Sequence, residues 1–188
     1  MINITGIGNG KKIFTKLLQE SNLDVNKVLY DPENFEKNSD ILLVIYDGLY
    51  INKYLKDFDY LQYIKHVPIF ITPHSIHVFG EVNDDIICCP YCMIKRITAR
   101  DFNLGLYDTL FNRIDFKSID RKKTKEFDHF IKLLLEMLSQ NKLLNTFLNY
   151  NLLNNLYYTE EVEGLSKCSI CDANKYDQQK LLQNIKEI

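Results

Sequence analysis

Five cysteines are the residues of this sequence whose type and spacing indicate chemistry most directly. Four of them form two Cys-x-x-Cys pairs, Cys89 with Cys92 and Cys168 with Cys171. Two residues between thiolates allow one tight turn to direct both sulfurs to a tetrahedral ion, and two such turns complete a closed four-sulfur shell. The pattern therefore predicts a structural Zn²⁺ site made by these four cysteines, with no coordination position left for a substrate.

Two other interpretations of the cysteines stay open. The four thiols are alternatively buried and reduced, with a coincidental spacing. A thioredoxin-like redox pair is disfavoured, because Cys168 does not follow a strand–helix unit of that kind. The fifth cysteine, Cys88, is either a small buried side chain or a nucleophile with His74 or His77 as its base. No base is placed beside Cys88 by the sequence, which favours the buried side chain.

A glycine-rich turn near the N-terminus is the second feature with chemistry to offer. Gly6 and Gly8 follow a short β-prone run and precede a helical pattern, which is where a nucleotide-binding fold places its phosphate loop. Asp31 follows a second predicted strand, at the position where an acid would bind a ribose. Lys11 replaces the third glycine of that fingerprint. The three residues therefore predict either the relic of a nucleotide site or a turn that glycine permits, and ATP is not expected on this chain.

The hydrophobic pattern predicts an α/β scaffold for these residues. Ile41 to Tyr46 is a continuous apolar run, typical of a parallel strand buried on both faces. Apolar residues recur at spacings of three and four between Ile51 and Ile64, which predicts an amphipathic helix. With further strands expected at 2–5, 28–30 and 68–72, this order indicates a parallel sheet with right-handed crossovers.

The pattern changes after residue 80. Short strands at 76–79 and 86–88 predict a hairpin, and helical stripes are expected from Lys125 onward and over 143–156. A strand is expected again at 157–159. We therefore predict a truncated Rossmann-like layer over residues 1–80, followed over residues 81–188 by a zinc-clamped, mainly helical C-terminal region, the two forming one compact unit.

Composition and charge exclude several classes of protein. The chain has 188 residues, of which 46% are hydrophobic and 26% charged, so it can bury a core and is not a disordered polypeptide. A net charge of −2 and a pI near 6.1 argue against non-specific nucleic-acid binding, which depends on a basic surface. The sequence contains no secretion signal and no apolar run long enough for a membrane span, so a cytoplasmic protein without membrane contact is expected.

The segment from Pro68 to Arg96, together with the distant second cysteine pair, resembles the E1-like superfamily. Within that superfamily it is most similar to the McbB-type (ocin-ThiF-like) zinc subunits of synthetases that form azole rings in ribosomally made peptides. In the resemblance, Cys89, Cys92 and the following Arg96 match the first cysteine pair and its basic residue, and the second pair matches the C-terminal one. The predicted layer is then an E1-type layer, and the metal is structural zinc.

The resemblance also implies partners. In azole synthetases of this kind, a separate YcaO-type cyclodehydratase uses ATP to cyclise the precursor peptide, and the zinc subunit docks the leader and supports that enzyme. The chain begins directly with the glycine strand, so a leader-binding domain is expected on another polypeptide, beside a flavin dehydrogenase. The implied protein is a non-catalytic member of a hetero-oligomer that binds no nucleic acid.

Two rival functions follow from the same residues. A free-standing E1-like enzyme would adenylate a carrier protein or peptide, but such enzymes have a complete glycine loop and arginines that hold the ATP phosphates. A zinc-ribbon protein would bind nucleic acid through Lys95, Arg96, Arg100 and the basic run at 121–125, with Tyr91 and Phe102 for base stacking. Basic clusters of this kind more often solvate a helix face.

Overall fold

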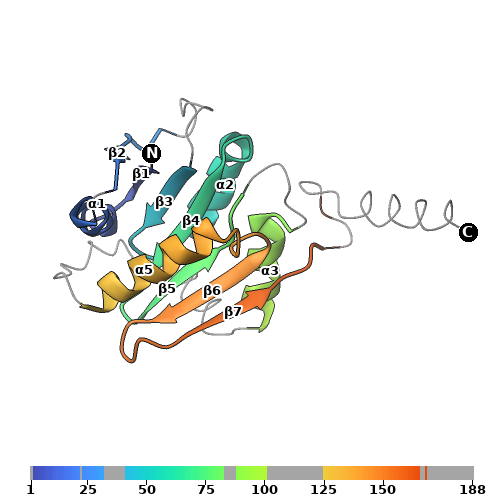
Figure 1. The fold of residues 1–188 in the computed structure, drawn as a ribbon. Coiled ribbons are helices and arrows are strands. Elements are labelled where there is room, and N and C mark those ends of the chain that lie inside the picture. The colour runs from blue at the N-terminus through green and yellow to red at the C-terminus, as the bar shows by residue number, and fades with distance from the viewer. Residues whose placement is uncertain are drawn as a thin grey trace, which may run out of the picture.

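The predicted α/β class is confirmed by the computed structural model, which describes residues 2–21, 23–31, 41–82, 88–100, 125–165 and 168. These residues form a seven-stranded sheet with the strand order β2-β1-β3-β4-β5-β6-β7. Helices α1 and α5 cover one face of the sheet, and α2 and α3 cover the other (Figure 1).

The elements have the following bounds in chain order. The strands are β1 (Ile2–Ile7), β2 (Val25–Lys27), β3 (Ile41–Tyr46), β4 (His66–Ile71), β5 (Ser75–Phe79), β6 (Thr146–Asn151) and β7 (Tyr157–Glu161). The helices are α1 (Gly10–Glu20), α2 (Ile51–Leu61), α3 (Pro90–Arg100) and α5 (Lys125–Ser139). The strand predicted at 41–46, the helix beginning at Ile51 and the helix beginning at Lys125 are confirmed.

The first four strands form the parallel half of the sheet. β1 lies between β2 and β3, and β3 pairs with β4, all in parallel. The strand predicted at 28–30 is wrong, because β2 ends at Lys27. Beyond Val28 the chain leaves the sheet, and the Tyr30 hydroxyl bonds the Tyr46 hydroxyl at 2.7 Å and donates a hydrogen bond to Asp57. These side-chain bonds draw the chain away from the strand direction.

The last three strands form the antiparallel half. β5 pairs with β4 on one edge and with β6 on the other, both antiparallel. A strand has only two edges, so no edge of β5 remains for the segment at 86–88, and the predicted hairpin is wrong. Residues 86 and 87 lie outside the described residues, and Cys88 is not in a strand.

The helix predicted over 143–156 is also wrong, because this stretch contains β6 and a turn. Asn145 and Asn155 have φ angles of 55° and 58°, in the left-handed region where asparagine is well tolerated and helices end. Between them, Phe147 and Tyr150 are buried in a strand that continues the sheet. Among the described residues after position 80, the helices α3 and α5 are therefore followed by the strands β6 and β7, and a mainly helical region is not confirmed.

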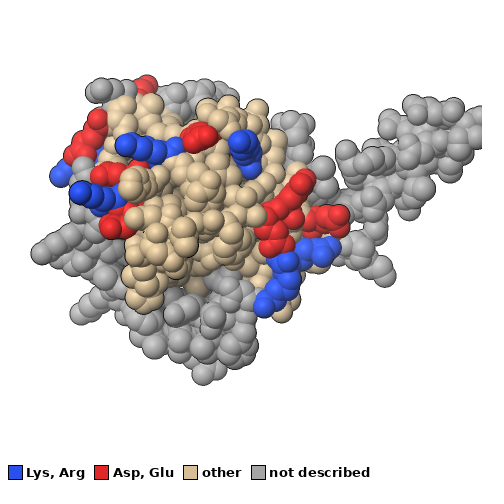
Figure 2. Space-filling model, turned by 60° about the horizontal axis from the view of Figure 1, so that its bottom comes forward, with Lys and Arg blue, Asp and Glu red and all other residues tan. Residues whose placement is uncertain are grey.

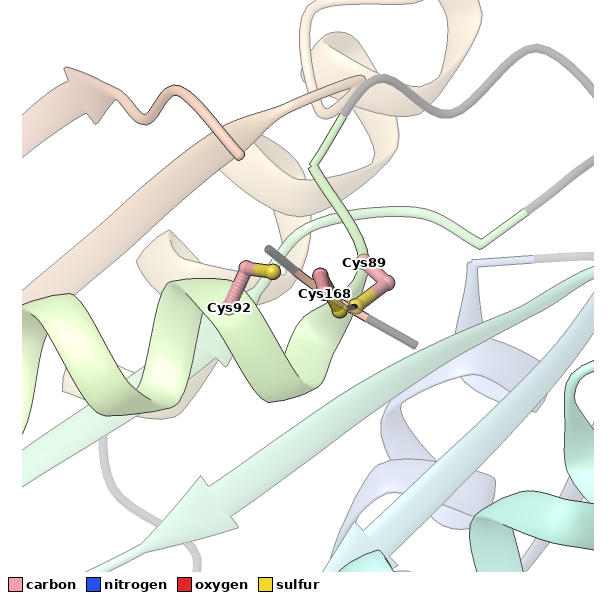
Figure 3. Close-up of side chains that lie close together, drawn as sticks. All are labelled: Cys89, Cys92 and Cys168. Atoms are coloured by element: carbon pink, nitrogen blue, oxygen red, sulfur yellow. Dashed lines mark hydrogen bonds between the residues drawn. The ribbon is translucent and has the colours of Figure 1, made fainter. Parts of the chain in front are cut away.

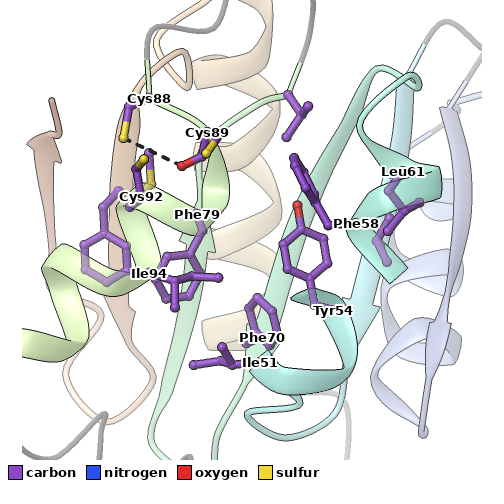
Figure 4. Close-up of a cluster of buried hydrophobic side chains, with 14 of the residues drawn as sticks. Ile51, Tyr54, Phe58, Leu61, Phe70, Phe79, Cys88, Cys89, Cys92 and Ile94 are labelled. Carbon is purple, nitrogen blue, oxygen red and sulfur yellow. Dashed lines mark hydrogen bonds between the residues drawn. The ribbon is translucent and has the colours of Figure 1, made fainter. Parts of the chain in front are cut away.

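Two apolar layers, one on each face of the sheet, make up the core. The layer under α1 and α5 contains Phe14 and Phe130, whose ring centroids lie 5.7 Å apart. The layer under α2 and α3 contains Tyr46, which stacks on Phe70 at 4.9 Å, and it continues to the cysteines before and within α3 (Figure 4).

Strands from before and after residue 80 belong to one sheet. The division of the chain into residues 1–80 and 81–188 stays a prediction. Among the described residues, no helix is both long and apolar enough to cross a membrane.

Candidate metal centre

Three of the four predicted ligands lie together at the start of α3. Cys89 directly precedes the helix, and Cys92 lies in its first turn, so the helix start positions both sulfurs on one side. Cys168 reaches the same place from the segment that follows β7, and the three sulfurs point toward one another (Figure 3). The fourth predicted ligand, Cys171, lies outside the described residues.

The separations of the sulfurs suit a shared metal ion. The Sγ atoms of Cys89 and Cys168 lie 3.6 Å apart, and all three sulfurs lie within 4.8 Å of one another. Sulfurs bound tetrahedrally to one zinc at about 2.3 Å lie about 3.8 Å from one another. A disulfide would require about 2 Å. The three cysteines are therefore placed so that their sulfurs could bind one metal ion together.

The environment of the three sulfurs is apolar. Cys89 and Cys92 are fully buried, and Cys168 is 6% exposed. They lie at one end of the apolar layer between α3 and α2, beside Phe79 (Figure 4). Thiolates without a counter-charge are costly in such surroundings, so the site suits either neutral thiols or thiolates bound to a cation. The 3.6 Å separation of the Cys89 and Cys168 sulfurs suits either arrangement, and soft thiolate ligands would select zinc or iron.

Cys88 does not belong to the group of sulfurs that could share a metal. Its side chain is buried, and its Sγ donates a weak hydrogen bond to the carbonyl oxygen of Cys89 at 3.7 Å. Its backbone N–H donates to Oδ1 of Asn145 at 2.8 Å, which fixes the entry to the turn that carries Cys89 and Cys92. The ring of His77 stacks on Phe147, with 6.2 Å between the centroids. A nucleophilic role for Cys88 stays an untested alternative.

Three basic residues of α3, the helix that carries Cys92, make contacts of their own. Arg96 extends from α3, and its Nη2 donates to the carbonyl oxygen of Gly164 at 2.9 Å. Lys95 places its Nζ 5.6 Å from the ring centroid of Tyr91. One turn further along the helix, Arg100 forms an exposed salt bridge with Glu160. Arg96 thus joins the helix that carries two of the cysteines to the segment that leads to the third.

The glycine turn is a close-packed connection between β1 and α1. Gly6 and Gly8 have φ angles of 139° and 91°, which side chains rarely adopt. A Cβ on Gly6 would lie 1.8 Å from the carbonyl oxygen of Ile45, and one on Gly8 would lie 2.4 Å from Cβ of Asp47. The packing of β1 against β3 therefore requires both glycines without any ligand.

Asp47 is the residue at this turn that the sequence analysis missed. Its carboxylate accepts the backbone N–H of Asn9 at 3.2 Å, at the N-terminus of α1. This N-terminus is where a nucleotide fold holds phosphate, because the first N–H groups of a helix lack partners within it. Lys11 bends back to the carbonyl oxygen of Gly6 at 3.1 Å. Asp31 is half-buried beyond the end of β2, and its ribose-binding role stays a prediction.

A buried histidine was also missed. His66 at the start of β4 is fully buried, and its Nδ1–H donates to the carbonyl oxygen of Ile64 at 2.8 Å. Its Nε2 then accepts the hydroxyl of Tyr54, also at 2.8 Å. Burial lowers the pKa of His66 from 6.5 to about 4, against the opposing effect of the bond to Ile64. The imidazole is therefore neutral at physiological pH. Burial, with a smaller effect of nearby Cys89, raises the pKa of Tyr54.

Comparison with known proteins gives matches in structure alone. No family model matches the sequence, and no curated protein matches it significantly. A chain of the E. coli microcin synthetase McbBCD complex matches with a TM-score of 0.65 and 12% identity, over 89% of this chain and 67% of that one. A heterocyclase solved with substrate and cofactor matches with a TM-score of 0.58 and 11% identity, over 95% of this chain and 26% of that one. E. coli MccB gives 0.52 and 13%, over 90% and 57%.

These likenesses show that the chain shares the fold of the microcin synthetase and heterocyclase structures. The chain spans about two thirds of the matched McbBCD chain and about a quarter of the heterocyclase chain. The sequence identities are too low to carry residue roles from those proteins to this one.

Proposed function

We propose that this chain is a non-catalytic, zinc-stabilised E1-like docking subunit of a cytoplasmic peptide synthetase that forms thiazole or oxazole rings. The observation that carries the proposal is the three-cysteine cluster on a fold shared with a chain of the McbBCD complex. Cys89, Cys92, Cys168 and Cys171 would hold the zinc. The ion would crosslink segments that are distant in the sequence. It would have no open coordination position for a substrate, since four thiolates fill its tetrahedral shell.

The glycine turn supports a role without adenylation. The Asp47 carboxylate receives the N–H of Asn9, where a phosphate would otherwise bind. A second negative group at that position would meet like-charge repulsion. In this proposal Gly6, Gly8 and Asp31 are relics of a nucleotide site, and a separate YcaO-type cyclodehydratase uses the ATP.

The partners in this proposal follow from the resemblance and from the proteins matched in structure. The chain would work in a hetero-oligomer with the cyclodehydratase, a flavin dehydrogenase, a separate leader-binding subunit and the precursor peptide. One matched protein belongs to a synthetase complex, and another was solved with substrate and cofactor. The first test is reconstitution. Mass spectrometry should detect the loss of one water per ring from the precursor only when this chain is present with the cyclodehydratase.

Metal analysis tests the centre itself. Protein purified under reducing conditions should contain one zinc per chain, and cobalt substitution should give the absorption bands of a tetrahedral thiolate site. Replacing Cys168 with serine should abolish stoichiometric binding, whereas replacing the neighbouring buried Cys88 should leave one metal per chain. Metal-free wild-type protein, or a Cys88→Ser variant that loses the metal as Cys168→Ser does, would refute the assigned ligand set.

The adenylating alternative makes the opposite prediction for ATP. A free-standing E1-like enzyme would exchange pyrophosphate into ATP in the presence of a carrier protein, and the proposed subunit would not.

The nucleic-acid alternative has less support, because Arg96 and Arg100 contact Gly164 and Glu160. The face shown in Figure 2 carries acidic and basic side chains next to one another and no continuous basic stripe among the described residues.

A further inference from the structure

Two residues join the segment that carries Cys168 to the start of α3. The first is Arg96, which lies four residues after Cys92 and therefore on the same side of the helix. Its guanidinium reaches the carbonyl oxygen of Gly164 at 2.9 Å, and Gly164 is four residues before Cys168. A hydrogen bond from a charged donor is stronger than one between neutral groups, so this contact can order the segment that it meets.

The second residue is Asn145, at the start of β6. Its side-chain Oδ1 accepts the backbone N–H of Cys88, and its carbonyl oxygen accepts the backbone N–H of Val162, both at 2.8 Å. One residue thus binds the entry to the metal-binding turn and the segment that follows β7. Its φ of 55° permits this double contact, because the left-handed conformation turns the chain into β6 immediately afterwards.

We propose that Arg96 and Asn145 are positioning residues that hold the Cys168 segment against the start of α3, so that the sulfurs are arranged before the metal binds. This inference rests on the proposed metal centre and adds to it the groups outside the ligand shell that determine its affinity. Without them, the metal alone must order a segment that is distant in sequence, and the ordering entropy reduces the observed affinity.

Cobalt titration monitored by thiolate absorption, followed by competition with a chelator, tests the proposal. Arg96→Gln removes the charged donor, and Asn145→Gly keeps the left-handed backbone while removing the side-chain acceptor. Each should weaken cobalt binding about tenfold to a hundredfold, the usual effect of losing a group that supports a ligand. Arg96→Lys, which keeps a charged donor, should recover part of the loss. Arg100→Gln is the matched control, because Arg100 is on the same helix and forms a salt bridge with the partly exposed Glu160.

The outcomes separate this inference from the proposed function. Wild-type protein that binds no cobalt would refute the metal centre itself. Wild-type protein that binds cobalt with unchanged affinity in Arg96→Gln and Asn145→Gly would leave the centre intact and overturn the positioning role. An equal loss in Arg96→Gln and Arg100→Gln would also overturn it, because the effect would then follow the charge of α3. Should one variant fail to fold, the other, on a different element, still decides the question.

Discussion

Acidification should weaken this fold through His66. The pKa of His66 is lowered from 6.5 to about 4 because the ring is fully buried, and the hydrogen bond to the carbonyl oxygen of Ile64 opposes this shift only in part. In the unfolded chain the imidazole regains its ordinary pKa, so the unfolded state binds more protons between these two values. The neutral ring therefore contributes stability that is fully present above about pH 6.5 and is lost progressively as the pH falls toward about 4.

The magnitude follows from the two pKa values. Between about pH 7.5 and about pH 5, a single group with these values lowers the free energy of unfolding by about 2 kcal/mol. Urea unfolding of metal-free protein, monitored by circular dichroism at both pH values, measures this change. Metal is removed because thiolate ligands also take up protons in acid.

The matched variant is His66→Asn, which offers an oxygen to Tyr54 and an N–H to Ile64 but does not titrate in this range. Other groups contribute equally to both proteins, so the difference between their pH slopes isolates His66. The wild type should lose about 2 kcal/mol more than the variant. Equal losses in the two proteins would refute the reasoning, whatever their absolute stabilities.

Two further substitutions test the packing of the sheet and its core. Gly6→Ala should lower the free energy of unfolding by more than about 3 kcal/mol, because its Cβ would lie 1.8 Å from the carbonyl oxygen of Ile45; a thermal unfolding curve close to that of the wild type would contradict this close approach. Phe70→Ala should cost about 3–5 kcal/mol in urea unfolding, because the ring is fully buried and stacks on Tyr46. Leu29→Ala is the control for both, since that side chain is 81% exposed and should change stability little.

The sequence allowed the parallel half of the sheet and the first cysteine turn to be predicted, because both depend on short-range patterns. The apolar run of β3 and the spacing of apolar residues in α2 match the observed elements. The prediction failed over 143–156, where leucines suggested a helix and the left-handed asparagines decided against it. The stretch contains no glycine or proline that would interrupt a predicted helix. Asn145 and Asn155 could nevertheless have been recognised as turn residues.

Partners that are distant in the sequence explain why the sequence did not reveal two buried polar residues. Asp47 matters because β3 lies beside β1, which brings its carboxylate to the start of α1. The one available signal is that acids directly after neighbouring parallel strands meet at the same edge of the sheet. His66 gives no such signal, because only the packing of α2 against β4 brings the hydroxyl of Tyr54 to its ring.

The separation of the cysteines along the chain has a consequence for biosynthesis. Cys89 and Cys168 are 79 positions apart, so the ribosome makes the first pair of thiols long before the later cysteines of the proposed centre. Until then, a nascent chain would carry an incomplete set of the proposed ligands, open to oxidation or to a competing soft metal. Strands β6 and β7 are also made in this interval. Closure of the proposed four-cysteine centre would therefore be a late event, which only a polypeptide translated through Cys171 can complete.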